Sequence, residues 1–391
     1  MKRIYMDNAA TTAMSPAAIN AVQQAWQVYG NPSSLHGAGR EAFFMLDKAR
    51  ADMAACLGAE KNEIFFTSGG SESDNWAILG AAKLMKAKGK TQIISTAIEH
   101  HAVLHTLNAL KKEGFEIILL PVSAEGYVTA QQVADAITEN TALVTVMMAN
   151  NEIGTVQPIS EIGEVCRKAG VLFHTDAVQA VGHIPVNVKE LNVDMLSLSA
   201  HKFHGPKGVG ALYVRKGIRL PNLINGGAQE NGRRAGTENL AGVCGMAAAL
   251  KAVTESMAED SAKISALRDK LIDGLLKVER TRLNGGRENR VPNNVSVCFE
   301  GIEGESLLLW LDAKGICASS GSACTPGSLD PSHVLLAIGL IHEVAHGSLR
   351  LSLSEHTTEE EVDYVIETVP AVVKYLREMS PVWEKIIKEE K

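Results

Sequence analysis

The sequence lacks the features that mark several large classes of protein. Basic residues are not in excess, since 38 lysines and arginines stand against 45 aspartates and glutamates, for a net charge of −7. This balance argues against non-specific binding of nucleic acid, which needs a basic surface. No apolar run approaches the roughly 20 residues that a membrane helix needs, and residues 1–7 turn polar before a signal-peptide core could form. We therefore expect a cytoplasmic protein with neither nucleic acid nor membrane among its partners.

Cysteine is scarce, and its six copies form no CxxC pair. They are Cys56, Cys166, Cys244, Cys298, Cys317 and Cys324. Most of them lie in apolar helix or strand patterns, where a reduced cysteine acts as a small buried hydrophobe. Cys324 is the exception, because residues 319–328 around it are small or polar and offer nothing apolar to cover the thiol. We expect this one thiol to be accessible.

At 391 residues the chain is too long for one small core, so we expect two domains. Apolar strands alternate with helices between about residues 60 and 215. This alternation predicts an α/β fold with a mixed, mostly parallel sheet covered by helices on both faces. The predicted strands span 64–67, 92–95, 115–120, 143–148, 171–175, 195–198 and 210–214, and the predicted helices span 72–85, 101–113, 129–137 and 159–169. Ligands of such sheets bind at the carboxyl ends of the strands.

The pattern changes after about residue 216. A polar, glycine-rich loop at 226–237 precedes a long helical stretch at 240–278. Short strands (294–299, 349–353) and helices (305–314, 358–379) follow. We predict a large domain over 15–255 and a smaller α+β domain made of 1–14 and 256–391.

A lysine and an aspartate follow two of the buried strands. Lys202 stands in a polar Ser-Ala-His-Lys turn after the strand 195–198, and Asp176 ends the strand before it, with Gln179 one turn later. Pyridoxal phosphate needs such a pair, because a lysine forms its Schiff base and an aspartate pairs with its pyridinium nitrogen. The alternative is a solvated lysine and a helix-capping aspartate.

The segment 67–73, Thr-Ser-Gly-Gly-Ser-Glu-Ser, joins a strand to a helix. Its two glycines let backbone amides approach an anion, and the helix N-terminus adds free N–H groups and a favourable dipole. The alternative is a helix capped by a box made of Ser71 and Asp74. The segment matches neither a P-loop nor GxGxxG.

Polar side chains follow two more strands. His100 would lie over the same sheet edge, where an imidazole can stack on a cofactor ring and move protons; the alternative is a capping or core histidine. Asn150 and Asn151 follow the strand 143–148 and can bond to a ligand, or they can form a turn.

Arg350 is the one charged residue of an apolar strand, 349–353. Such a residue is costly to bury unless it is paired, and a substrate carboxylate gripped by both guanidinium nitrogens is a suitable partner. Strand alternation also allows an outward-facing arginine. The nearby His342–His346 stretch matches the HExxH zinc pattern, but Gly347 would end the helix that this pattern needs, so we expect no metal site there.

These motifs together are similar to those of a known family. In chain order they lie at 5–12, 30–36, 67–73, 99–100, 150–154, 174–179, 199–202, 236–239, 319–324 and 350. Over nearly its whole length the chain resembles the class I cysteine desulfurases of the NifS/IscS type, within the class V aminotransferase superfamily of pyridoxal phosphate (PLP) fold type I. The family usually has Ala-Thr where this chain has Gly70-Ser71; since serine keeps the hydroxyl, we expect the phosphate still to bind.

The resemblance implies pyridoxal 5'-phosphate as cofactor and L-cysteine as substrate. It assigns Lys202 to the covalent link with the cofactor, His100 to stacking on the ring and moving a proton, and Cys324 to accepting the sulfur. The residues that it assigns to the cofactor are Gly70, Ser71, Asn151, Asp176, Gln179, Ser199, His201 and Thr237, with Thr237 reaching in from the partner subunit. It assigns Arg350 and Asn151 to the carboxylate side of the substrate.

The implied reaction converts L-cysteine to L-alanine and leaves a persulfide on Cys324. The implied partners are a second copy of the chain and an acceptor of the sulfur, either an iron–sulfur cluster scaffold or another protein. Competing interpretations are another fold type I enzyme (a selenocysteine lyase or an aminotransferase), a scaffold without catalysis, and a zinc hydrolase. Cys317 could relay sulfur, although it more simply packs at the end of a strand.

Overall fold

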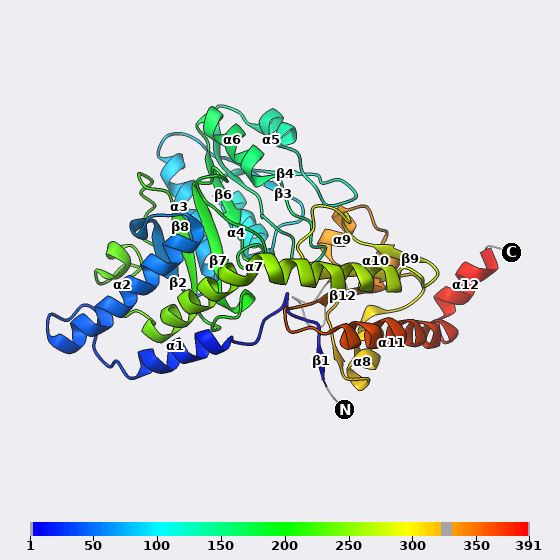
Figure 1. The fold of residues 1–391 in the computed structure, drawn as a ribbon. Coiled ribbons are helices and arrows are strands. Elements are labelled where there is room, and N and C mark those ends of the chain that lie inside the picture. Colours follow the sequence, from blue (N-terminus) through cyan, green and yellow to red (C-terminus); the bar gives the residue numbers. More distant parts are fainter. Residues whose placement is uncertain (1–2, 322–330, 390–391) are drawn as a thin grey trace.

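A seven-stranded sheet forms the centre of the larger part of the molecule (Figure 1). The computed structural model describes residues 3–321 and 331–389. Across the sheet the order is β2-β8-β7-β6-β5-β3-β4. The strands are β2 (Ile64–Thr67), β3 (Gln92–Thr96), β4 (Glu116–Leu120), β5 (Thr141–Thr145), β6 (Leu172–Asp176), β7 (Met195–Ser199) and β8 (Gly210–Val214). Strand β8 is antiparallel to β2 and β7, and the other neighbours are parallel. The predicted mixed, mostly parallel sheet is confirmed.

Alternate residues of the central strands pack on opposite faces of the sheet. Ile93 and Leu143 join the apolar cluster under helices α3 (Gly70–Lys86) and α4 (His101–Lys112). Their neighbours Ile94 and Val144 join a larger cluster on the other face. The helices that contribute to this larger cluster are α1 (Pro16–Trp26), α2 (Gly37–Leu57), α5 (Ala130–Ala136), α6 (Ile159–Ala169) and α7 (Leu240–Leu275). This period of two makes a three-layer α/β arrangement.

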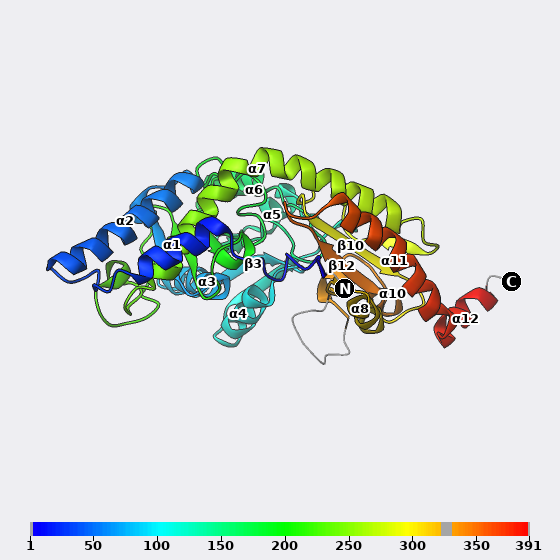
Figure 2. The same cartoon turned by 60° about the horizontal axis from the view of Figure 1, so that its bottom comes forward.

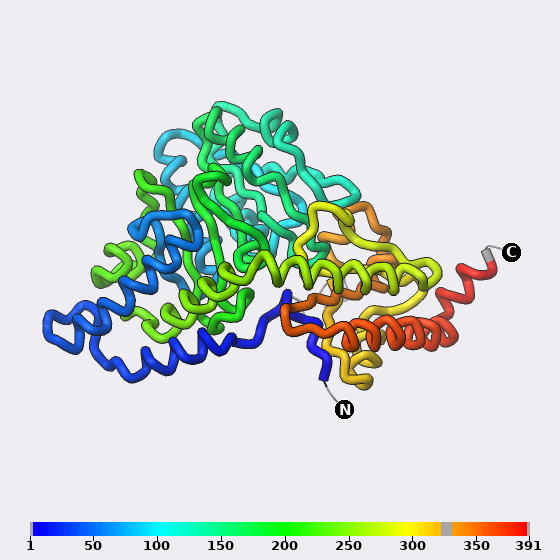
Figure 3. Tube along the Cα trace, viewed as in Figure 1, coloured from blue at the N-terminus to red at the C-terminus, as the bar shows by residue number. Residues whose placement is uncertain are grey.

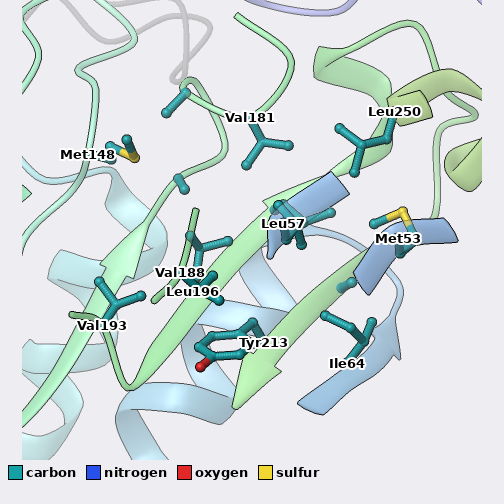
Figure 4. Packing of buried hydrophobic residues seen from close by; sticks show 14 of the residues in the cluster. Met53, Leu57, Ile64, Met148, Val181, Val188, Val193, Leu196, Tyr213 and Leu250 are labelled. Atoms are coloured by element: carbon teal, nitrogen blue, oxygen red, sulfur yellow. The ribbon is translucent and has the colours of Figure 1, made fainter. Parts of the chain in front are cut away.

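Figure 4 shows part of the larger cluster. Met53 and Leu57 of α2 lie over the sheet near Leu250 of α7, and Leu196 and Tyr213 lie beneath them on β7 and β8. All five side chains are at most 3% exposed. The core under these helices therefore fixes the strands whose carboxyl ends hold the predicted site.

Strand β5 differs from the prediction of 143–148, since it spans Thr141–Thr145. The chain bends beyond Thr145, but its backbone still bonds to β6: the amides of Val146 and Met148 donate to the carbonyls of His174 and Asp176 at 3.2 and 2.8 Å. The apolar run thus continues as buried, irregular backbone. It leads residues 149–154 to the carboxyl edge of the sheet.

The smaller part has its own sheet and core (Figure 2). Strand β10 (Asn294–Phe299) lies between β9 (Thr281–Leu283) and β12 (Ser348–Ser352), and all three are antiparallel. The short strands β1 (Ile4–Tyr5) and β11 (Ile316–Cys317) pair in parallel beside them. The helices of this part are α8 (Gly304–Ala313), α9 (His333–Ala337), α10 (His342–His346), α11 (Glu359–Glu378) and α12 (Pro381–Glu389). The predicted strands and helices of an α+β domain are present.

Helix α7 runs through both parts of the molecule, as the tube in Figure 3 shows. Its residues up to Leu250 belong to the core of the large part, and those from Ile264 onward to the core of the small part. The proposed domain boundary between residues 255 and 256 therefore lies inside one helix. By length and composition α7 could span a membrane, contrary to the expectation from the sequence, but half of its apolar window is buried, as in a core helix.

The N-terminal segment connects the two parts. After β1, which pairs in the small part, residues 6–15 cross to α1 in the large part (Figure 1). On the way, the amide of Ser352 donates to the carbonyl of Met6 at 2.8 Å, and the amide of Thr12 donates to the carbonyl of His201 at 2.9 Å. This crossing takes the carbonyls of Ala9 and Ala10 past the carboxyl ends of β6 and β7.

Candidate active site

A cavity of about 310 Å³ opens at the carboxyl ends of β6 and β7. Residues from the sheet edge, from helix α3, from the N-terminal segment and from the small part line it together. They are Ala9, Ala10, Gly70, Ser71, Asp74, His100, Met147, Asn151, Asp176, Val178, Gln179, Ser199, His201, Lys202 and Arg350. Ten residues of this set are ones that the sequence predicted for the site: Gly70, Ser71, His100, Asn151, Asp176, Gln179, Ser199, His201, Lys202 and Arg350.

Lys202 ends a short 3₁₀ turn, Ala200–Lys202, directly after β7. Its amine Nζ donates to the carbonyls of Ala9 and Ala10 at 2.7 and 2.8 Å. Its own carbonyl accepts from Nε2 of His183 at 3.1 Å. The alternative of a solvated lysine is wrong, because the amine is oriented into the cavity by two backbone acceptors.

Asp176 is the last residue of β6 and is 5% exposed. One carboxylate oxygen accepts from the amide of Val178 at 2.9 Å. Burial raises the pKa of Asp176 to about 6, although the Val178 amide and the charge of Lys202 oppose the rise. A carboxyl in this state gains most from a cationic partner in the cavity, such as a protonated ring nitrogen.

Gln179 lies in the turn after Asp176 and lines the same cavity. Its amide nitrogen Nε2 donates to the carbonyl of Ala9 at 2.9 Å. Two side chains, those of Gln179 and Lys202, therefore bond to the same N-terminal carbonyl. The predicted contact of Gln179 with a cofactor hydroxyl stays a prediction.

A buried layer of polar side chains lies behind Asp176, and the sequence reasoning missed it. Asp74 is 1% exposed and lines the cavity. Its Oδ1 lies 3.6 Å from Nε2 of His174 and has no hydrogen-bond partner among the described residues. The ring of His174 also contacts Thr145 and Ser197 at 2.8 and 2.9 Å. Burial, together with the charge of Asp176, raises the pKa of Asp74 well above its usual value.

The predicted phosphate end of the cavity is formed by the start of α3. Gly69 precedes the helix with φ +157°, and no side chain of the described residues caps it, so the first turn of α3, whose Gly70 and Ser71 line the cavity, keeps free amides for an anion. The alternative capping box of Ser71 and Asp74 is wrong. A Cβ at Gly70 would lie 2.7 Å from Cγ2 of Val178, which gives a steric reason why this chain has glycine where the family usually has alanine.

Ser199 and His201 line the cavity beside these amides. Nδ1 of His201 lies 3.1 Å from the hydroxyl of Thr11. Burial, and then the charges of Lys202 and Lys207, lower the pKa of His201 to about 4. The imidazole is therefore neutral near pH 7 and has a ring N–H to offer an anion.

His100 caps helix α4 and also lines the cavity. Its Nδ1 accepts from the amide of Ala102 at 3.1 Å, so the neutral ring carries its proton on Nε2. Burial, followed by the charge of Lys202, lowers the pKa of His100 to about 4. His100 thus both caps α4 and lines the cavity, and near pH 7 its neutral ring can donate a hydrogen bond from Nε2.

Replacing His100 by asparagine separates these two roles. Asparagine is a good N-cap, so we expect the thermal midpoint of the protein to change little, whereas turnover falls by roughly 10²–10⁴-fold because the proton-transfer group is lost. His105→Asn, on an exposed position of the same helix, is the matched control. Equal turnover in the two variants contradicts the role of His100.

The two asparagines after β5 have different surroundings. Asn150 is fully buried; its Oδ1 accepts from the amides of Glu152 and Ile153 at 2.9 and 3.0 Å, and its Nδ2 donates to the carbonyl of Ile98 at 2.9 Å. Asn150 thus forms the turn, as the alternative held. Asn151 lines the cavity, and its carbonyl accepts from Nη1 of Arg350 at 3.0 Å.

Arg350 reaches the cavity from β12 of the small part and is 4% exposed. Its Nη2 pairs with Oδ1 of Asp7 at 3.1 Å, and its Nε has no partner among the described residues. The alternative of an outward-facing arginine is wrong. A buried guanidinium that lines a cavity suits a carboxylate ligand.

Other predicted positions lie elsewhere. Thr237 is exposed and does not line this cavity, and Cys324 lies outside the described residues. Cys317 is half-buried in β11. The stretch His342–His346 forms a helix of five residues that ends at Gly347, and residues 3–321 and 331–389 contain no group of three side chains placed to hold a metal ion.

The residues of the cavity fit PLP. Lys202 offers an amine, Asp176 a buried carboxyl behind it, and the uncapped start of α3 with Ser199 and His201 offers donors for a phosphate. Arg350, from β12 of the small part, and Asn151, which bonds to it, line the same cavity. The arrangement can hold an amino acid between a covalently anchored cofactor and a buried arginine.

The chain is similar to known proteins over nearly its whole length. The aminotransferase class-V family matches residues 4–365. The protein named cysteine desulfurase IscS of Clostridium botulinum is 54% identical over 99% of this chain and 98% of its own length. Cysteine desulfurase NifS of Azotobacter vinelandii is 47% identical over 98% and 96%. A solved NifS-like protein superposes with a TM-score of 0.90 at 40% identity, covering 96% of this chain and all of its own, and the structure of SspA in complex with cysteine superposes with 0.80 at 37%, covering 91% and 100%.

Proposed function

The chain belongs to the aminotransferase class-V family of PLP-dependent enzymes, among the cysteine desulfurases, and on that premise we propose how its own residues carry out the reaction. The enzyme converts L-cysteine to L-alanine and supplies the sulfur to acceptors. The observation that carries the assignment of residues is the convergence of Lys202, Asp176, His100 and Arg350 on one cavity. Bound PLP supplies the electron sink for the pair released when the Cα–H bond of the substrate breaks.

Arg350 and the groups that hold it bind the substrate. Arg350, which lines the cavity, binds the substrate carboxylate, and Asn151 fixes the arginine through its carbonyl. Asp7 holds the other guanidinium nitrogen at 3.1 Å. A substrate bound at Arg350 would lie in the same cavity as the amine of Lys202.

Lys202 and His100 transfer the protons. The amine Nζ of Lys202, held by the Ala9 and Ala10 carbonyls, takes the proton from Cα. The carboxylate of Asp176 keeps a proton at the ring nitrogen of the cofactor. His100, neutral and protonated on Nε2, exchanges a proton with the departing sulfur.

Cys324 accepts the sulfur. Its thiolate attacks the substrate sulfur, so that an S–S bond forms on Cys324 and the C–S bond of the substrate breaks; the carbon fragment takes up protons and leaves as alanine. No cysteine is among the described residues that line the cavity. Cys324 itself lies outside the described residues.

A product assay tests the function. With L-cysteine and a thiol reductant we expect alanine and sulfide in equal amounts. An aminotransferase would instead form a keto acid without sulfide, and a selenocysteine lyase would form alanine from selenocysteine with little or no turnover of cysteine. Either outcome would overturn the proposed function while leaving the cofactor site intact.

We also propose that the enzyme is a homodimer. Exposed apolar side chains gather on α1 and α2 and on the loop between them: Trp26 is 70% exposed, Tyr29 92%, Leu35 91% and Phe44 64%. Such a surface is typical of an interface. A second cavity of about 370 Å³ lies outside the phosphate end, lined by Ser68, Gly69 and Lys207 among others, and Thr237 of the partner subunit can enter there. Sedimentation at a mass near 42 kDa rather than twice that value would contradict the dimer.

The acceptor and the compartment are further proposals. We propose that the persulfide is passed to an iron–sulfur cluster scaffold or another acceptor protein in the cytoplasm. The relatives named cysteine desulfurase IscS and NifS support the transfer of sulfur to an acceptor. The burial of half the apolar window of α7 supports a core helix over a membrane helix. Transfer of ³⁵S from labelled enzyme to a purified scaffold protein, and recovery of the enzyme in the soluble cell fraction, are the expected results. Membrane-bound enzyme or no transfer would contradict them.

A further inference from the structure

A buried histidine lies where three segments of the chain meet, outside the residues assigned to the reaction. His204 follows Lys202 by two residues, and its side chain is 6% exposed. Its backbone has φ +64°, a left-handed conformation that is unfavourable for residues other than glycine. Surrounding contacts must therefore hold His204 in place.

The N-terminal segment provides the first of these contacts. The amide of His204 donates to the hydroxyl of Thr12 at 2.8 Å, and the amide of Ser15 donates to the carbonyl of His204 at 2.9 Å. Thr12 also bonds to the carbonyl of His201 through both its amide and its hydroxyl, at 2.9 and 3.1 Å. The crossing segment is thus bonded along the turn that contains Lys202.

The imidazole ring provides the second contact, and its geometry defines its charge. Nδ1 lies 2.9 Å from the carbonyl of Ala13, and Nε2 lies 3.2 Å from Oε2 of Glu355. A carbonyl and an ionised carboxylate can only accept hydrogen bonds. With Glu355 ionised, both ring nitrogens are placed to donate, so these two contacts favour the imidazolium form of His204.

The charged groups around the ring support this state. Burial lowers the pKa of His204, but the bond and charge of Glu355, the Ala13 carbonyl and the charge of Asp260 outweigh it, so that the pKa lies above its usual value. Although burial opposes it, His204 lowers the pKa of Glu355 to about 2. Two other histidines face the pair. His183 is half-buried, and burial and the charge of His204 lower its pKa to about 4. The side chain of His356 is 72% exposed and lies 3.4 Å from the other oxygen of Glu355.

Glu355 belongs to the small part, in the turn between β12 and α11. Its carbonyl accepts from the amine of Lys263 on α7 at 2.6 Å, which fixes the turn. The ion pair with His204 therefore joins the small part, the N-terminal segment and the Lys202 turn at one point. The same N-terminal segment carries the Ala9 and Ala10 carbonyls that orient the amine of Lys202.

We propose that His204 is a positioning residue, whose charged ring, held between the Ala13 carbonyl and Glu355, fixes the N-terminal segment against Lys202 and ties it to the small part in a pH-dependent way. The inference rests on the proposed function only in that Lys202 is the reacting lysine. It assigns a role to a residue that does not line the cavity of the site.

The pH dependence has a defined direction. A histidine whose pKa is raised by folding stabilises the protein fully below its unfolded pKa of about 6.5, and this contribution is lost as the pH rises through the higher folded value. For Glu355, whose pKa is lowered, the contribution is present above about 4.3 and is lost only as the pH falls toward about 2. The ion pair between His204 and Glu355 is therefore fully formed between about pH 4.5 and 6.5, and it is lost at alkaline pH.

The test compares Glu355→Gln with His356→Gln. Glutamine keeps the shape of Glu355 but removes its charge, so we expect the thermal midpoint of the holoenzyme to fall by about 2–4 °C at pH 6 and the deficit to vanish at alkaline pH. His356→Gln removes the exposed neighbour of the same carboxylate and should change the midpoint little at any pH. A deficit for Glu355→Gln that does not change with pH would overturn the proposal.

Two further measurements separate positioning from general stability. The first is an NMR titration of ¹³C-histidine-labelled protein, in which the signal of His204 is assigned with His204→Gln. His204 should titrate above pH 6.5, and its titration midpoint should be lower in Glu355→Gln. Titration at or below pH 6.5 in the wild type overturns the proposal.

The second is the turnover of Glu355→Gln. It should be reduced by up to roughly 10-fold at pH 6.5 and should equal that of the wild type at alkaline pH, since misplacing a reacting group costs rate. A ratio independent of pH contradicts positioning. The thermal midpoint and the NMR titration of His204 are measured without the substrate L-cysteine. Their outcome therefore does not depend on whether the proposed function is correct.

Discussion

Replacing Lys202 by alanine is expected to abolish cysteine turnover and leave the fold intact. Lys202 is the only lysine among the described residues that line the cavity, and its amine is directed there by the Ala9 and Ala10 carbonyls. The substitution removes both the covalent anchor of the cofactor and the base for the Cα proton, so turnover should fall by on the order of 10⁴-fold or more. The absorbance band of lysine-linked cofactor should disappear as well.

Lys216→Ala is the matched control for this variant. Lys216 follows β8 on the same sheet, is 69% exposed, and pairs only at 3.4 Å with Glu60. Its loss should leave both the spectrum and the turnover unchanged. Steady-state turnover of the Lys202 variant within tenfold of the wild type would contradict the assignment of this lysine.

Replacing Cys324 by serine is expected to stop sulfur transfer without removing the cofactor. A serine hydroxyl has nearly the same size as the thiol but is not ionised near neutral pH, so it cannot attack the substrate sulfur. No described residue of the cavity could take its place as a thiol. We expect the cofactor absorbance of the wild type, no persulfide on the protein, and a loss of alanine formation of at least 10²–10³-fold.

Cys317→Ser provides the comparison within the same region. Cys317 is half-buried in β11, where its carbonyl accepts from the amide of Met6 at 2.9 Å, and it does not line the cavity. This variant should transfer sulfur at the wild-type rate. Transfer that survives in Cys324→Ser, or that is lost in Cys317→Ser, would give the sulfur-accepting role to another residue.

The elements of the large part could be predicted from the sequence because their signals are local. Strands β2, β3 and β7 are short apolar runs, and the helix expected over 72–85 is α3, which begins two residues earlier at Gly70. A period of two along β3 places Ile93 and Ile94 on opposite faces. These local signals do not define the end of a strand, as β5 shows: the apolar run continues to residue 148, but the strand ends at Thr145.

Contacts between distant segments could not be predicted from the same signals. Nothing near Lys202 in sequence indicates that the carbonyls of Ala9 and Ala10 would hold its amine, or that Asp7 would pair with Arg350. Asp74 looked like part of a capping box because its local spacing fits one, but packing of α3 on the sheet turns it toward the buried His174. Only the folded chain brings these groups together.

The absorbance spectrum of the purified protein, before and after addition of L-cysteine, tests the central claim most directly. The assignment of Lys202 and Asp176 to a PLP site predicts a yellow protein, whose visible band shifts when L-cysteine is added and whose products are alanine and sulfur in equal amounts. A yellow protein that does not respond to cysteine would keep the cofactor site and refute the substrate. A colourless protein that cannot be reconstituted with pyridoxal phosphate would contradict the account at its foundation.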